Sequence, residues 1–144
     1  MPEIVFALYR PKPGRASDLL AIVTEHVPAL RKLGLVTVRA PIVARSRKDG
    51  TIIEVFEWAS AETIERAHRD PVVQKHWARF AECAEYPTFG QLAEASEVFA
   101  GFEPVNVNAP RKRVSAGPKK MQAKKRAPRG ARARPRCALL RLRA

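Results

Sequence analysis

The stretch from residue 53 to residue 71, IEVFEWASAETIERAHRDP, holds the side chains that are best placed for chemistry. Trp58 ends an apolar alternation, and His68 follows ten residues later, just before an Asp-Pro pair. An imidazole titrates near neutral pH, so His68 is a candidate general base for a phenolic proton. Trp58 is a candidate wall against which an aromatic ligand stacks. The alternative is an ordinary core, in which Trp58 anchors a strand and His68 packs or caps near the break.

Other residues around this stretch are expected to contact the same ligand. Ile64 precedes His68 by one helical turn and therefore shares its face. The predicted helix that follows the Asp-Pro pair contains His76 and Trp77. The first predicted strand, which contains Phe6, is apolar on both faces. The full set of expected substrate-binding residues is Trp58, Ile64, His76, Trp77 and Phe6.

Two carboxylates of the same strand are candidates for orienting a histidine. Side chains alternate along a strand, so Glu54 shares a face with Trp58 and Glu57 lies on the other. An exposed hairpin charge is the alternative interpretation of either residue. His26, in the first predicted helix, is expected to pack within that helix.

The remaining chemistries find no support in the sequence. The three histidines lack an H-x-x-x-H spacing, and no carboxylate motif joins them, so no metal site is predicted. There is no glycine-rich phosphate loop and no serine or cysteine in a recognisable nucleophile setting. We therefore expect no cofactor.

Apolar periodicity predicts an α+β fold with the element order β-α-β-β-α-β. Ser17 is expected to cap the first helix, Gly34 to end it and Pro28 to kink or divide it. Pro41 favours an edge position or a bulge, and Asp49-Gly50 predicts a hairpin. The expected strands are residues 3–10, 35–45, 51–58 and 96–105, and the expected helices cover residues 17–33, 60–69 and 71–85.

This order is that of the ferredoxin-like plait, an antiparallel sheet with helices on one face. Several of the strands are nevertheless apolar on both faces. The uncovered sheet face must be buried by something else, and the same face of a second copy is the simplest partner. We therefore expect a homodimer formed through sheet faces.

The net charge of +13 is concentrated at one end of the chain. All 14 acidic residues precede residue 105, whereas 14 of the 27 lysines and arginines follow it. We expect residues 1–105 to form the domain and residues 106–144 to be a disordered basic tail, which either binds phosphate backbones without sequence preference or is an extension of the reading frame. The candidate nucleic-acid contacts are Arg111, Lys112, Arg113, Lys119, Lys120, Lys124, Lys125 and Arg126.

Composition predicts a cytoplasmic protein. No secretory signal is visible at the start of the chain, and no apolar run approaches the ~20 residues that span a bilayer. Cys83 and Cys137 form neither a disulfide framework nor a metal-ligand pattern.

The first strand ending in PKPG, the DGT hairpin and the run EWASAETIERAHRDP resemble the antibiotic biosynthesis monooxygenase (ABM) superfamily over residues 3–105. The resemblance implies a dimeric α+β barrel and, in some branches, cofactor-free oxygenation of phenols or quinols. The asparagine that the haem-degrading and polyketide-oxidising branches use is missing, because Asn106 and Asn108 lie beyond the last predicted strand. That departure argues against haem degradation.

Three functions follow from these observations. The first is a small-molecule-binding ABM-like protein that acts as a cofactor-independent monooxygenase of an electron-rich aromatic or quinol substrate, with His68 as the base. The second is a non-catalytic ligand-binding or structural member of the same fold. The third is a nucleic-acid-associated dimer that presents two basic tails.

Overall fold

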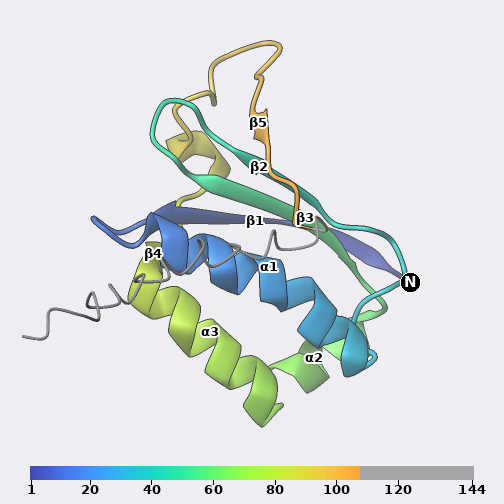
Figure 1. Ribbon diagram of the computed structural model, residues 1–144. Helices are drawn as coiled ribbons and strands as arrows, with labels where there is room; N and C mark the ends of the chain where they lie inside the picture. The colour runs from blue at the N-terminus through green and yellow to red at the C-terminus, as the bar shows by residue number, and fades with distance from the viewer. Residues whose placement is uncertain (108–144) are drawn as a thin grey trace, which may run out of the picture. The chain divides into compact units, whose positions relative to one another are not determined.

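A five-stranded antiparallel sheet with three α-helices on one face makes up the part of the chain that the computed structural model describes, residues 1–107 (Figure 1). The architecture is therefore α+β, as expected, and is consistent with a ferredoxin-like plait. In chain order the elements are β1 (Glu3–Pro11), α1 (Ala16–Lys32), β2 (Ile42–Arg45), β3 (Ile52–Trp58), α2 (Ala61–Ala67), α3 (Pro71–Cys83), β4 (Ala84–Glu85), the 3-10 helix η1 (Phe89–Gln91) and β5 (Glu103–Pro104).

The strands are ordered β4-β1-β3-β2-β5 across the sheet. β1 and β3 form its centre, with Val5 opposite Phe56 and Ala7 opposite Glu54. β2 and β3 are joined by the expected hairpin, whose Gly50 has φ +76°, a conformation that residues with a Cβ rarely adopt. β4 pairs with β1 only at Arg10 and Pro11, so within residues 1–107 no strand pairs with the first part of β1 on this side.

Two expected strands are shorter in the structure. The predicted strand 35–45 is reduced to β2, with an isolated bridge from Val36 to Trp58, because Pro41 has no N–H with which to continue the ladder. The predicted strand 96–105 is also wrong over most of its length. Val98 and Phe99 are exposed, and only β5 pairs, next to β2 at the edge of the sheet. Apolar residues without a face to bury did not make a strand there.

The first helix, α1, begins at a different residue from the one expected, but the side that it buries is the expected one. It begins at Ala16 with Arg15 as N-cap, so Ser17 is not the cap. It also continues through Pro28, where we expected a kink or a division. Val27 and Leu30, each 1% exposed, hold the helix against the sheet on both sides of this proline.

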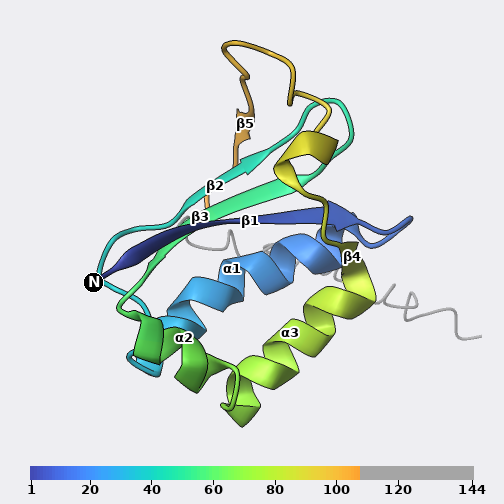
Figure 2. The ribbon, with the colours of Figure 1, turned by 180° about the vertical axis from the view of Figure 1, so that it is seen from behind.

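The later helices begin where the sequence analysis expected, but each ends two residues earlier, α2 at Ala67 and α3 at Cys83. Ser60 caps α2 in a reciprocal capping box with Thr63, and Asp70 caps α3 by accepting from two backbone N–H groups. α1 and α3 lie side by side on the same face of the sheet in both ribbon views (Figures 1 and 2). Together with β1 and β3 they enclose the core.

The two faces of the sheet are buried to different extents. Phe56 and Trp58 of β3 face the helices, in a core that includes Val27 and Leu30. On the opposite face, Leu8 and Ile53 pack with Leu92, from the segment after α3. That segment covers only part of the face: Ile4 and Phe6 are 50% exposed and Ile42 is 66% exposed.

The body of the fold extends slightly beyond the boundary expected at residue 105. The backbone N–H of Val105 donates to the carbonyl of Val43, and Val107 packs against the core. The candidate nucleic-acid residues, Arg111 to Arg126, lie outside the described residues. No helix within residues 1–107 combines the length and hydropathy that a bilayer-spanning segment needs.

Candidate functional site

A cavity of about 550 Å³ lies between the sheet, the helices and the segment that follows α3. Its walls come from β1, β3, α1, α3 and residues 86–89, and they are mainly aromatic and aliphatic. Phe6, Tyr86 and Phe89 are each at least half exposed, which places the mouth of the cavity beside them. The full lining is Val5, Phe6, Ala7, Leu8, Tyr9, His26, Phe56, Trp58, Trp77, Phe80, Tyr86, Pro87, Thr88 and Phe89.

His26 is the one imidazole among these lining residues, and a buried carboxylate holds it. Its Nδ1 atom lies 3.0 Å from Oε2 and 3.2 Å from Oε1 of Glu54. Glu54 is fully buried and His26 is 2% exposed. The Tyr9 hydroxyl donates a second hydrogen bond, of 2.9 Å, to Oε2 of Glu54. The three side chains form a buried Tyr9–Glu54–His26 triad.

The hydrogen bond between His26 and Glu54 decides which nitrogen of the imidazole carries the proton. An ionised carboxylate only accepts hydrogen bonds, so opposite an ionised Glu54 the Nδ1 atom of His26 is the donor and carries the proton. In the neutral imidazole the other nitrogen, Nε2, then has the free lone pair. Within the described part of the chain, Nε2 is buried and has no hydrogen-bond partner. His26 is therefore set up to accept a proton at Nε2.

Tyr9 stabilises the charge of Glu54 without competing for the proton. Burial and the neighbouring Glu54 carboxylate raise the pKa of the Tyr9 phenol well above its usual value. The phenol consequently stays protonated near neutral pH and donates to Glu54. It also stacks on Phe80, with ring centroids 4.4 Å apart, which fixes the position of its hydroxyl.

Aromatic rings also fix the plane of the imidazole. The edge-to-face contacts of His26 with Phe80 and Phe56 have centroid distances of 5.1 and 5.5 Å. These rings bring no polar group into the cavity. A ligand in this space would meet mainly apolar walls and, from the triad, the side chains of His26 and Tyr9, which is a composition that suits a planar aromatic molecule with one hydroxyl.

Local periodicity explains how the sequence brings the triad together. His26 lies four residues after Ile22 and four before Leu30, on the stripe of α1 that packs on the sheet. Glu54 has the parity of Phe56 and Trp58, the helix-facing side of β3. Tyr9 lies on the same sheet face, in the core cluster with Leu19 and Ile22. The three residues therefore meet in the layer between sheet and helices.

Three of the expected substrate-binding residues line the cavity: Phe6, Trp58 and Trp77. The direction of Trp58 was open in the sequence. Its side chain is 6% exposed and packs with Val27 and Phe56 on the helix-facing side. The strand parity that placed Glu54 on the same face as Trp58 agrees with the structure.

The other expected site residues lie elsewhere. His68 is exposed at the end of α2 and contacts the edge of Trp77, with centroids 4.9 Å apart, instead of lining the cavity. His68 is the C-cap of α2 and is not among the residues that line this cavity. Ile64 packs at the margin of the core cluster of Trp58. His76 lines a separate groove between α1 and α3.

Sequence reasoning missed His26 as a site residue, although a signal was present. A histidine inside a stripe of leucine, isoleucine and valine must find a polar partner when the stripe is buried. Glu54 carries the same signal, because it interrupts the run TIIEVFEW on its buried face. Each of the two polar groups supplies the partner that the other needs.

The described residues offer no metal centre: within residues 1–107, no group of three or more histidine, cysteine, aspartate or glutamate side chains is placed to hold an ion. Comparisons of the chain with models of protein families, with curated proteins and with solved structures gave no match. The likeness to the ABM superfamily therefore stays a hypothesis.

Proposed function

We propose that the chain binds a small phenol or quinol in the aromatic cavity and that the His26–Glu54 pair removes the proton of its hydroxyl. The observation that carries this proposal is the buried contact of 3.0 Å between Nδ1 of His26 and Oε2 of Glu54, at the wall of a mainly apolar cavity. A histidine oriented by a carboxylate is a common general base. This role replaces the one that we expected for His68.

The proton transfer uses both ends of the imidazole. The hydroxyl of the ligand donates to Nε2 of His26, and its proton moves to that nitrogen. The imidazolium that forms keeps its Nδ1–H bond to Glu54, whose negative charge stabilises the new positive charge. The apolar walls strengthen this interaction by keeping water away from it.

The anion that results is electron-rich enough to react with dioxygen, which enters as the second substrate. One oxygen atom is incorporated into the ring, the other leaves as water, and the electrons come from the oxidation of the quinol to a hydroxylated quinone. Hydrogen and oxygen balance without a reductant other than the quinol. This is the cofactor-independent monooxygenase reaction that the resemblance to the ABM superfamily implies.

We propose a dimeric α+β barrel as the assembly. Its support is the sheet face opposite the helices, where Ile4, Phe6 and Ile42 are half exposed or more. The register places them together, because Phe6 and Ile42 both lie opposite Val55 on β3. A second copy that packs on this face buries them, which is the arrangement expected of the superfamily.

Oxygen uptake with a panel of quinols tests the proposed function. We expect the wild-type protein to consume oxygen with at least one quinol, and His26→Gln to reduce the rate by a factor of about 10²–10⁴. His68→Gln is the matched control and should keep the wild-type rate. Tight binding of every quinol without turnover would instead favour the non-catalytic ligand-binding alternative.

A further inference from the structure

His26 lines the cavity but its side chain has almost no exposed surface, so a proton that it accepts needs a route to solvent. Its side chain is 3% exposed, and the edges of Phe56 and Phe80 cover the ring. Glu54 already receives two hydrogen bonds and lies fully buried. Tyr9 keeps its own proton, because its pKa is raised. The triad itself therefore contains no group that can return the proton to solvent.

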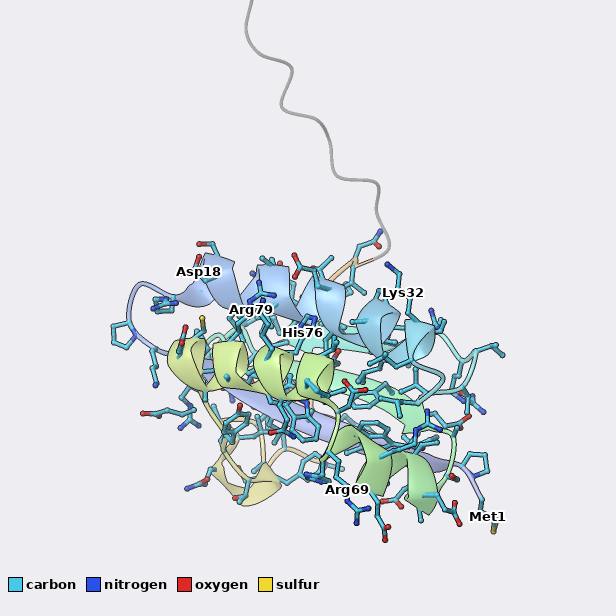
Figure 3. The ribbon with its side chains drawn as sticks, turned by 90° about the horizontal axis from the view of Figure 1, so that it is seen from below. Met1, Asp18, Lys32, Arg69, His76 and Arg79 are labelled. Atoms are coloured by element: carbon cyan, nitrogen blue, oxygen red, sulfur yellow. The ribbon has the colours of Figure 1, made fainter. Side chains whose placement is uncertain are left out.

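A second histidine lies next to this enclosed base, on the side away from the sheet. The ring centroids of His26 and His76 are 6.3 Å apart, with the planes tilted by 50°. His76 belongs to α3 and is partly exposed in the groove between α1 and α3. Figure 3 shows the labelled His76 in the space between these two helices. It is thus in contact with both the interior and the surface.

Each of the two rings has one buried nitrogen that lacks a hydrogen-bond partner within residues 1–107. These atoms are Nε2 of His26 and Nδ1 of His76. A direct bond between imidazole nitrogens requires ring centroids about 5 Å apart, so 6.3 Å is too long for one. One water that bonds to both nitrogens satisfies this separation, since buried waters occupy such positions between polar groups.

We propose that His76 relays the proton of His26 to solvent through one water, which lies between Nε2 of His26 and Nδ1 of His76 whenever no ligand hydroxyl occupies Nε2. After the product leaves, this water takes the proton from Nε2 and passes another to Nδ1 of His76. His76 then releases the proton of its own Nε2 into the groove between α1 and α3. This proposal rests on the proposed function in one respect, namely that the proton comes from the hydroxyl of the bound ligand.

The charges around His76 favour rapid release. The pKa of His76 is lowered by burial, by His26 and by Arg79, while Glu25 acts in the opposite direction. Arg79 of α3 forms an ion pair of 3.0 Å with Glu25 of α1, and Lys32 of α1 lines the same groove. An imidazolium with a lowered pKa does not hold its proton, which is the property that a relay needs.

The relay is tested without any substrate, by measuring how fast His26 exchanges its proton with solvent. ¹⁵N relaxation dispersion of the His26 ring, in the full chain at low buffer concentration, gives this rate. We expect His76→Ala to slow the exchange by about tenfold or more. Added imidazole, which fits the groove that the truncation enlarges, should restore it, whereas a purely structural role of His76 would not be rescued. His68→Ala is the matched control and should exchange at the wild-type rate.

The two hypotheses fail separately in this experiment. An unchanged exchange rate in His76→Ala, or a slowed rate that imidazole does not restore, would overturn the relay even if quinols are oxidised. A slowed and rescued rate supports the relay even if no quinol is oxidised, in which case only the proposed function fails. In an active protein, His76→Ala should also make the oxygen-uptake rate depend on buffer concentration.

Discussion

The Nδ1 atom of His26 lies 3.0 Å from Oε2 of Glu54, and this contact joins the middle of α1 to the middle of β3. It places a charged group and a titratable ring in the most buried layer of the molecule. Removing one partner of such a pair leaves the other unpaired and costs about 3–5 kcal/mol, so the pair contributes to folding as well as to chemistry. Its effects on stability and on activity can be measured separately.

The hydrogen bond from Tyr9 to Glu54 should contribute measurably to stability. Tyr9→Phe removes one bond to a buried carboxylate, and we expect the free energy of unfolding to fall by about 1.5–3 kcal/mol in urea titrations. Tyr86→Phe, at the exposed rim of the same cavity, should change it by less than about 0.5 kcal/mol. Equal stability of Tyr9→Phe and the wild-type protein would contradict the geometry of the triad.

Tryptophan fluorescence should report ligand binding directly. The chain has two tryptophans, Trp58 and Trp77, and both line the cavity. We expect a bound phenol to quench their emission, and Trp77→Leu to weaken the affinity by about threefold to tenfold through the loss of one aromatic contact. Phe99→Leu, on the exposed segment before β5, is the control and should bind as the wild type does. Quenching that does not saturate with phenol would show that the cavity is not the binding site.

We expect the homodimer to form through the sheet face opposite the helices, which carries the exposed Ile42. Ile42→Glu places a charge in the proposed interface, so we expect sedimentation velocity to show a dimer for the wild-type chain and a monomer for the variant. Val98→Glu carries the same change on an exposed residue outside the sheet and should remain dimeric. A wild-type chain that sediments as a monomer would contradict the barrel assembly.

Acid should weaken the fold partly through His76. The pKa of this side chain is lowered in the folded protein, so the unfolded chain, with a histidine pKa near 6.5, binds the proton more readily. The stability contributed by neutral His76 is therefore present above about pH 6.5 and is lost as the pH falls below it. Urea titrations from pH 7 to pH 5 should show a smaller loss for His76→Gln than for the wild type. The same loss in both proteins would show that His76 is not responsible.

The elements were predictable where local signals agreed with long-range packing. The hairpin at Asp49-Gly50, the cap at Ser60 and the break at Asp70-Pro71 each depend on a few neighbouring residues, and the structure has all three. Residues 96–105 also show an apolar pattern, but nothing in the described chain gives Val98 and Phe99 a surface to bury against. A strand forms only where another strand pairs with it, and the apolar pattern of residues 96–105 does not show whether such a partner is present.

The site was predictable in its residue types but not in its pairing. Glu54 was correctly placed on the face of Trp58, and a carboxylate that orients a histidine was foreseen as one option. We expected the helix after Ser60 to continue to residue 69, whereas α2 ends at Ala67, and helix ends are the least certain feature of a periodic pattern. His26 was not considered as a base, because it was expected to pack within its own helix.

The central claim is that His26 deprotonates a phenol inside the aromatic cavity. The absorption spectrum of 4-nitrophenol tests it directly, because the band moves to longer wavelength when the phenol ionises. At a pH at which the free phenol is mostly neutral, we expect binding to the wild-type protein to produce the phenolate band. The same phenol bound to His26→Gln should stay neutral, and His68→Gln should behave as the wild type does. A bound phenol that stays neutral in the wild-type protein, or that ionises equally in His26→Gln, would contradict the account.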